Sequence, residues 1–164
     1  MTTYLLDANV FIQAKNLHYG FEFCPAFWDW LVQENSAGRV FSIERVGDEI
    51  QAVDDELAEW ARQRPGLFLA PDTEMVPSLT VVSSWANGQG YEPVGVATFL
   101  QVADYYLVAQ AHAHDYVVVT HEVFSPSPKK IKIPNACIGV GVKFVNPYEM
   151  LRTERAQFVL GPSP

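Results

Sequence analysis

The segment Tyr116-Val117-Val118-Val119-Thr120 is a short, mostly apolar run rich in β-branched residues. Such a run is typical of a strand that is buried on both faces of a parallel sheet. A similar run, Tyr4-Leu5-Leu6, stops at Asp7 and predicts a second buried strand. Helical patterns fill much of the sequence between the two runs. Because strands that alternate with helices form parallel sheets, we expect an α/β fold.

The other elements follow from the same kinds of pattern. Short strands are expected over residues 40–43, 67–70 and 142–145, and helices after residue 9, over 25–34, 44–64 and 96–114, and from 71 and 146. The pattern predicts a three-layer fold, with a central parallel sheet of about four to five strands and helices on both faces. We expect one domain over residues 1–157 and a loose C-terminal tail over residues 158–164.

Length and composition favour a single folded domain. The chain has 164 residues, of which 49% are hydrophobic. Its net charge of −8 argues against non-specific attraction to nucleic-acid phosphates, although bound divalent cations would reverse the local field. Cys24 and Cys137 are expected to be free thiols, and no segment resembles a membrane span or a signal peptide. We therefore expect a cytoplasmic protein with no membrane partner.

Two carboxylates fall on helix faces that should be buried. Asp104 lies within the apolar stripe that includes Leu107, and Glu49 lies at the edge of the stripe that includes Val46. A charged carboxylate is rarely buried unless it is paired or binds a metal ion. A salt bridge is the simpler explanation for either acid alone.

Four acids considered together favour a metal site. Asp7 and Glu122 follow two predicted strands, at the edge where the active residues of parallel sheets collect. Glu49 and Asp104 face inward from helices, and the sequence offers no matching set of inward-facing Lys or Arg. Neighbouring carboxylates repel each other, and divalent cations relieve that repulsion. The four acids therefore predict a site for Mg²⁺ or Mn²⁺, which prefer oxygen ligands.

The order and spacing of these residues resemble the motifs of PIN-domain (VapC-like) nucleases. The resemblance rests on four segments: Tyr4-Leu5-Leu6-Asp7-Ala8-Asn9-Val10-Phe11, Ser42 followed by Glu49, Asp104-Tyr105-Tyr106-Leu107-Val108-Ala109-Gln110-Ala111, and Val118-Val119-Thr120-His121-Glu122. The aromatic stretch over residues 19–30 suggests a larger branch than the short bacterial toxins, and its alternative interpretation is ordinary core.

The resemblance implies a metal-dependent endoribonuclease that cleaves RNA phosphodiester bonds. By similarity, the catalytic and metal-binding acids are Asp7, Glu49, Asp104 and Glu122, with Mg²⁺ or Mn²⁺ as cofactor. Asn9 and Thr120 would support these acids or contact the substrate. Two departures from the family pattern are Ala8, where a hydroxyl residue is common, and Glu122, where Asp is common.

The resemblance also suggests partners. Many smaller members of the family resemble the toxin of a toxin–antitoxin pair, so an antitoxin protein and a second copy of the chain are candidate partners besides RNA. Three lysines follow the last acid and are candidate phosphate contacts, unless they are simply solvated charges. They are Lys129, Lys130 and Lys132.

Two other functions remain open at this stage. A phosphatase of the haloacid-dehalogenase type also begins with an acid after the first strand, but it usually has Asp-x-Asp where this chain has Asp7-Ala8-Asn9. The only later acidic pair in this chain is Asp54-Asp55, which lies in the predicted helix over 44–64. The second alternative is a catalytically silent PIN-like module, which retains the acids and binds RNA or protein without cleaving a substrate.

Overall fold

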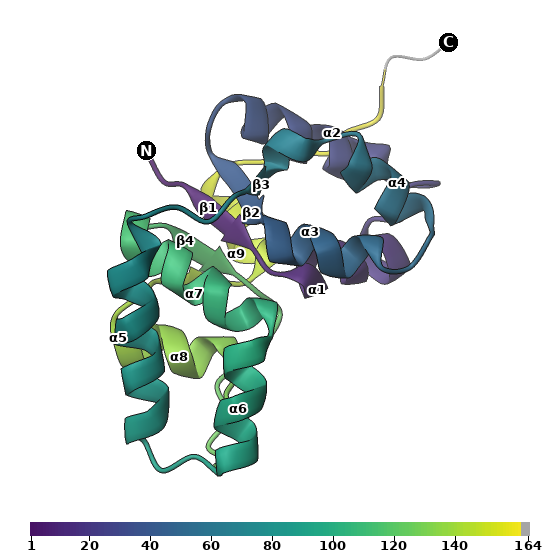
Figure 1. Cartoon of the computed structure of the whole chain (residues 1–164). Coiled ribbons are helices and arrows are strands. Elements are labelled where there is room, and N and C mark those ends of the chain that lie inside the picture. The colour runs from purple at the N-terminus through teal and green to yellow at the C-terminus, as the bar shows by residue number, and fades with distance from the viewer. Residues whose placement is uncertain (162–164) are drawn as a thin grey trace.

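The computed structural model describes residues 1–161 and contains a five-stranded parallel sheet in the order β3-β2-β1-β4-β5. The strands are β1 (Tyr4–Leu6), β2 (Val40–Ile43), β3 (Phe68–Leu69), β4 (Val117–Val119) and β5 (Phe144–Val145). Each lies in a segment where the sequence predicts a strand. The α/β fold with a central parallel sheet and surrounding helices is therefore confirmed (Figure 1).

The register of the central strands brings two predicted site segments together. Tyr4 of β1 pairs with Val40 of β2 on one side and with Val117 of β4 on the other. All pairs are parallel, so the carboxyl ends of β1 and β4 lie side by side at one edge of the sheet. The backbone N–H of Asp7 donates to the carbonyl oxygen of Val119 at 2.9 Å, which extends this pairing beyond β1.

Helices surround the sheet in two groups (Figure 1). The first group, α1 to α4, lies at the top and right of the view, and the second, α5 to α8, packs together below the sheet. The helices are α1 (Ala8–Gln13), a π-helical turn η1 (Ala14–His18), α2 (Pro25–Ser36), α3 (Glu44–Gln51), α4 (Glu56–Arg62), a 3₁₀ turn η2 (Pro65–Leu67), α5 (Met75–Gly88), α6 (Pro93–Gln101), α7 (Ala103–His114), α8 (Ile133–Val140) and α9 (Pro147–Thr153).

The predicted continuous helix over residues 44–64 is wrong. The segment forms α3 and α4, separated by residues 52–55. Asp55 begins α4 because its side chain accepts a hydrogen bond from the backbone N–H of Ala58 at 2.9 Å. The same carboxylate is paired with Lys15 at 2.8 Å. Because Val53 lies in the break between α3 and α4, this member of the predicted apolar stripe is 65% exposed.

We expect Asp55→Ala to lower the free energy of unfolding by about 1–2 kcal/mol, because the N-terminus of α4 loses its cap and Lys15 loses its partner. Urea unfolding measures the change. Asp54→Ala is the matched control, since that side chain is 91% exposed and should change stability by less than about 0.5 kcal/mol. Equal losses in the two variants would contradict this role of Asp55.

Several other boundaries differ from the prediction. The helix expected over 96–114 is broken at Val102 into α6 and α7, which places Asp104 in the first turn of α7. The helix expected from residue 71 begins at Met75, and α8 was not predicted. Phe158 packs against Tyr19 and Phe27, so ordered packing continues one residue past the expected boundary at 157. The part of the expected loose tail over 162–164 lies outside the described residues.

The aromatic stretch over residues 19–30 contributes to the core. Tyr19 stacks on Phe27 with ring centroids 4.4 Å apart, and Phe21 stacks on Trp28 at 4.0 Å. Cys24 and Cys137 are unpaired thiols, as expected. Within residues 1–161, no helix combines the length and apolar character needed to cross a membrane.

Candidate functional site

Asp7 is a buried carboxylate at the end of β1. Its side chain is only 5% exposed, and it accepts hydrogen bonds from the N–H of Ala8 at 2.7 Å and from the Thr120 hydroxyl at 2.9 Å. Burial, followed by the negative charge of Asp104, raises the pKa of Asp7 to about 8, although the Thr120 bond acts in the opposite direction. The fold therefore favours a protonated Asp7 at neutral pH.

The Thr120 hydroxyl connects the segments that follow β1 and β4. It donates to Asp7, accepts from the Asn9 amide at 3.4 Å and accepts from the backbone N–H of Glu122 at 3.0 Å. Asn9 also accepts from the backbone N–H of His121 at 3.1 Å. Asn9 therefore supports the Asp7 carboxylate through Thr120.

Asp104 is half-buried in the first turn of α7. Burial, followed by the negative charges of Glu122 and Glu49, raises the pKa of Asp104 to about 6. Lys130 and Lys132 oppose this change. Within residues 1–161 the Asp104 side chain has no hydrogen bond or ion pair, so its oxygens are available to a ligand.

Glu122 follows β4 and is partly neutralised by its surroundings. One oxygen lies 3.7 Å from the Lys132 ammonium, and the other accepts from the backbone N–H of Ile133 at 3.3 Å. The sequence was expected to offer no matching set of inward-facing Lys or Arg, and Lys132 is a single basic partner for Glu122. Glu122 is also close enough to raise the pKa values of both Asp7 and Asp104.

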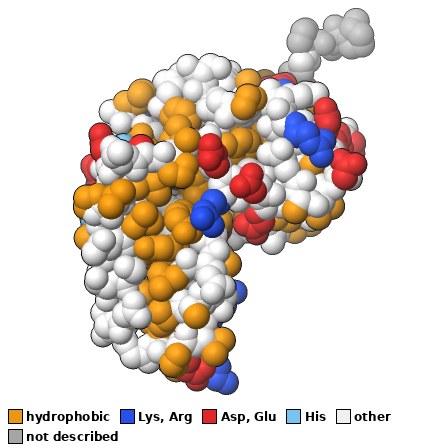
Figure 2. Space-filling view, in the orientation of Figure 1, with side chains coloured by type: hydrophobic (Ala, Val, Ile, Leu, Met, Phe, Trp, Pro, Cys, Tyr) orange, Lys and Arg blue, Asp and Glu red, His pale blue; other side chains and the backbone are white. Residues whose placement is uncertain are grey.

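The prediction that Glu49 faces the interior is wrong, because its side chain is exposed on α3. It borders a cavity of about 580 Å³, which we call the acid cavity. This cavity lies between α3, the break between α6 and α7, and the segment after β4; Figure 2 shows acidic and basic side chains gathered around the hollow between the two groups of helices. The lining includes Arg45, Asp48, Glu49, Thr98, Asp104 and Lys130.

Sequence analysis missed part of this lining. Asp48 is not among the candidate residues of the sequence, and its exposed side chain borders the cavity. Thr98 and Gln101 lie at the end of α6 and line the cavity because the chain breaks at Val102. Val102 gives no clear signal of that break, because valines also lie inside α6 and α7.

The three lysines occupy different surroundings. Lys130 lines the acid cavity, Lys132 is paired with Glu122, and Lys129 is exposed. Their segment is held against the first turn of α6, where the N–H of Glu92 donates to the Pro128 carbonyl oxygen at 2.9 Å. A Cβ on Gly95 would lie 2.5 Å from the Lys129 carbonyl oxygen, so this close approach requires glycine.

Gly95→Ala is expected to lower the free energy of unfolding by about 1–3 kcal/mol, because the added methyl group collides with backbone. In an open helix the same change usually stabilises by about 0.5–1 kcal/mol, so the sign of the effect is diagnostic. Urea unfolding measures it. Gly88→Ala is the control, because a Cβ there meets nothing within 4 Å. A stabilised Gly95→Ala protein would show that the lysine segment is not held in this way.

The donor set suits a hard divalent cation, because all four candidate ligands are carboxylates and two have pKa values raised by their neighbours. Within the described part of the chain, no group of three or more His, Cys, Asp or Glu side chains is already gathered closely enough to hold a metal ion. The acids are therefore electrostatic neighbours, and coordination would require their side chains to close around the ion.

Comparisons with solved structures agree with this architecture. The chain is similar to the crystal structure of FitAcB from Neisseria gonorrhoeae, with 19% sequence identity, a TM-score of 0.55, and coverage of 89% of this chain and 99% of that one. It is equally similar, by identity and TM-score, to the structure of FitAB bound to an IR36 DNA fragment, covering 89% of this chain and 96% of that one. At this identity the likeness shows the fold, which is PIN-like.

The sequence itself places the protein in a family. The profile of the family described as "Domain of unknown function (DUF4411)" matches residues 4–158, so the chain belongs to that family. No curated protein sequence matches the chain significantly.

Proposed function

We propose that the protein is a Mg²⁺- or Mn²⁺-dependent endoribonuclease that cleaves RNA phosphodiester bonds. The observation that carries the proposal is the electrostatic coupling of four carboxylates from four separate segments. Burial, followed by the charges of Glu122 and Glu49, raises the pKa of Asp104, and burial, followed by the charges of Asp104 and Glu122, raises the pKa of Asp7. Such coupled acids at the carboxyl ends of parallel strands are typical of functional sites.

In this proposal, Asp7, Asp104 and Glu122 hold the ion, and Glu49 completes or tunes the site. A bound divalent ion supplies an activated water and stabilises the charge on the phosphate oxygens. Asp7 and Asp104 hold protons more readily than ordinary carboxyl groups and release them when their oxygens take a cationic ligand. Thr120 keeps the Asp7 carboxylate oriented by its hydrogen bond at 2.9 Å.

The direct test is incubation of the purified protein with single-stranded and hairpin RNA in Mg²⁺, in Mn²⁺ and in excess chelator. We expect internal cleavage that requires the metal. Metal binding without cleavage of any RNA would favour the alternative of a silent RNA- or protein-binding module.

We expect Lys130→Ala to weaken RNA binding and to reduce the magnitude of its salt dependence by about one counterion, because Lys130 lines the acid cavity and lies near Asp104. Fluorescence anisotropy at several salt concentrations, without divalent metal, measures both quantities. Lys129→Ala is the matched control outside the cavity lining. Equal effects of the two substitutions would contradict a specific phosphate contact by Lys130.

The phosphatase alternative has less support. Its second acidic pair would be Asp54-Asp55, but Asp55 caps α4 and Asp54 is paired with Arg62 at the surface. Hydrolysis of a chromogenic phosphomonoester by the purified protein would favour the phosphatase alternative.

We further propose that an antitoxin-like protein binds and inhibits the chain. This rests on the resemblance to the smaller PIN-domain toxins, and it is compatible with the similarity to FitAB, whose structure was determined on DNA. Growth arrest on expression of the chain alone, relieved by a protein that co-purifies with it, would support the proposal. Growth unaffected by expression of an active nuclease would contradict it.

A further inference from the structure

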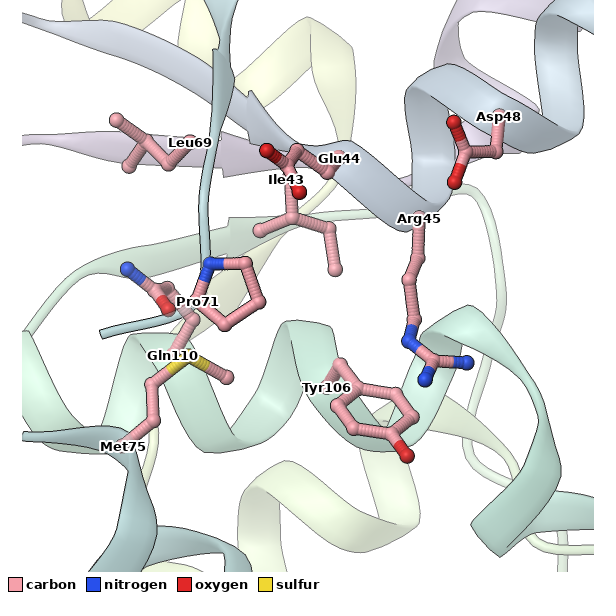
Figure 3. Close-up of a pocket in the computed structure, with 9 residues that line it drawn as sticks. All are labelled: Ile43, Glu44, Arg45, Asp48, Leu69, Pro71, Met75, Tyr106 and Gln110. Atoms are coloured by element: carbon pink, nitrogen blue, oxygen red, sulfur yellow. The ribbon is translucent and has the colours of Figure 1, made fainter. Parts of the chain in front are cut away.

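A second cavity, of about 440 Å³, is lined by residues of α3 and α7 (Figure 3), and we call it the Tyr106 cavity. Arg45 and Asp48 of α3 line both this cavity and the acid cavity, so the two cavities are adjacent. A chain-like ligand that extends from the acid cavity past Arg45 would therefore enter the Tyr106 cavity.

The Arg45 side chain crosses from α3 to an aromatic ring on α7. Its guanidinium lies 3.7 Å from the centroid of the Tyr106 ring, and Figure 3 shows it reaching from α3 to that ring. Asp48 and Glu49 follow Arg45 by three and four residues on α3, a spacing at which helical side chains meet. Arg45 nevertheless forms no ion pair with them or with any other carboxylate of residues 1–161. The fold therefore positions this cation without neutralising it.

A guanidinium held in this way suits a phosphate. Stacking occupies one face of the planar group, while its N–H donors lie in the plane and remain free at the edge. Two such donors match two phosphate oxygens, and the contact is stronger than one from a neutral donor. Arg45 is exposed at the border of the acid cavity, so a phosphate can reach it. Glu44 and Asp48 border the Tyr106 cavity as well, and they would repel a phosphate if the Arg45 charge were removed.

Arg45 and the lysines serve different parts of the acid cavity. The basic groups that most lower the pKa of Asp104 are Lys130 and Lys132. Arg45 instead lies where the acid cavity meets the Tyr106 cavity. A polynucleotide that passes through both cavities would therefore present one phosphate to the acids and another to Arg45.

We propose that Arg45, oriented by the ring of Tyr106, binds a backbone phosphate of the RNA other than the one that is cleaved. The proposal rests on the proposed nuclease function for its substrate class. Arg45 contributes to binding and to the position of the RNA. Tyr106 acts through Arg45, as a positioning residue.

The test is a scan of one short, labelled single-stranded RNA in which each phosphodiester is replaced in turn by an uncharged methylphosphonate. Fluorescence anisotropy without divalent metal measures binding apart from cleavage. In the wild type we expect one linkage, different from the one cut in Mn²⁺, whose neutralisation weakens binding by about fivefold. Arg45→Ala should bind unmodified RNA about fivefold more weakly and lose nothing further at that linkage, because the two changes remove the same contact.

The salt dependence of binding separates the charge from its orientation. Arg45→Ala should reduce the slope of log affinity against log salt concentration by about 0.7, the value for one phosphate contact on a single strand. Tyr106→Leu retains the charge, so it should weaken binding by about threefold with the slope unchanged. Arg62→Ala is the matched control, since it removes an exposed arginine on α4 outside both cavity linings, and it should bind as the wild type does.

Urea unfolding checks that each variant is folded. The proposal is wrong if folded Arg45→Ala binds unmodified RNA as the wild type does, or if it shows the wild-type pattern of losses in the scan, even when the wild type cleaves RNA. An arginine that only braces α3 against α7 would give that second result together with lower stability. An Arg45-dependent linkage in a protein that cleaves no RNA in Mg²⁺ or Mn²⁺ supports the phosphate site and contradicts the proposed function.

Discussion

Asp7→Asn is expected to lower the rate of Mn²⁺-dependent RNA cleavage by about 10³-fold, a loss of about 4 kcal/mol of transition-state stabilisation. Asp7 is the most buried of the four acids, and its oxygens face Thr120 and Ala8 at one end of the site. Asn retains the shape of the side chain but removes the charge that would bind the ion. Initial rates on one labelled RNA at saturating Mn²⁺ give the comparison.

The matched control is Asp29→Asn, which removes one carboxylate from an exposed position on α2. It should leave the rate within about twofold of the wild type, whereas Asp104→Asn should be impaired like Asp7→Asn. A fully active, folded Asp7→Asn protein would mean that the cleavage does not use this site.

The second large effect concerns stability, where Asp7→Asn is expected to be more stable than the wild type at neutral pH without metal. The pKa of Asp7 is raised to about 8 in the folded protein from an ordinary value of 3.8. Between those values the unfolded chain has released the proton while the folded chain still holds it, so wild-type stability falls as pH rises. Asn imitates the protonated form and does not carry this penalty.

Thermal unfolding at several pH values measures this difference. We expect the Tm of Asp7→Asn to exceed that of the wild type by at least about 5 °C at pH 7.5, and the difference to shrink to about 1 °C at pH 4. Added Mn²⁺ should raise the Tm of the wild type more than that of the variant, because binding stabilises the folded state. A variant that is less stable at pH 7.5 would show that Asp7 is not penalised by burial and repulsion.

The parts of the site carried by short strands could be predicted from the sequence. Apolar runs at 4–6 and 117–119 are recognisable locally, and parallel pairing places the residues that follow them at one edge of the sheet. This is why Asp7 and Glu122 could be placed together. The helical stripe likewise directed Asp104 towards the interior, where it is half-buried.

The breaks and pairings could not be predicted in the same way. The apolar steps of three and four continue through residues 52–55 and hide the new helix start, where Asp55 caps α4 and also pairs with the distant Lys15. Lys132 lies beside Glu122 at the start of α8, a helix that the sequence pattern did not predict.

The most direct measurement of the central idea is the anomalous signal of Mn²⁺ in crystals of the wild-type protein soaked with the ion. The account predicts Mn²⁺ coordinated by oxygens of Asp7, Asp104 and Glu122, with Lys132 displaced from Glu122. Crystals saturated with Mn²⁺ that show no ion among these carboxylates, while Lys132 remains paired with Glu122, would contradict it.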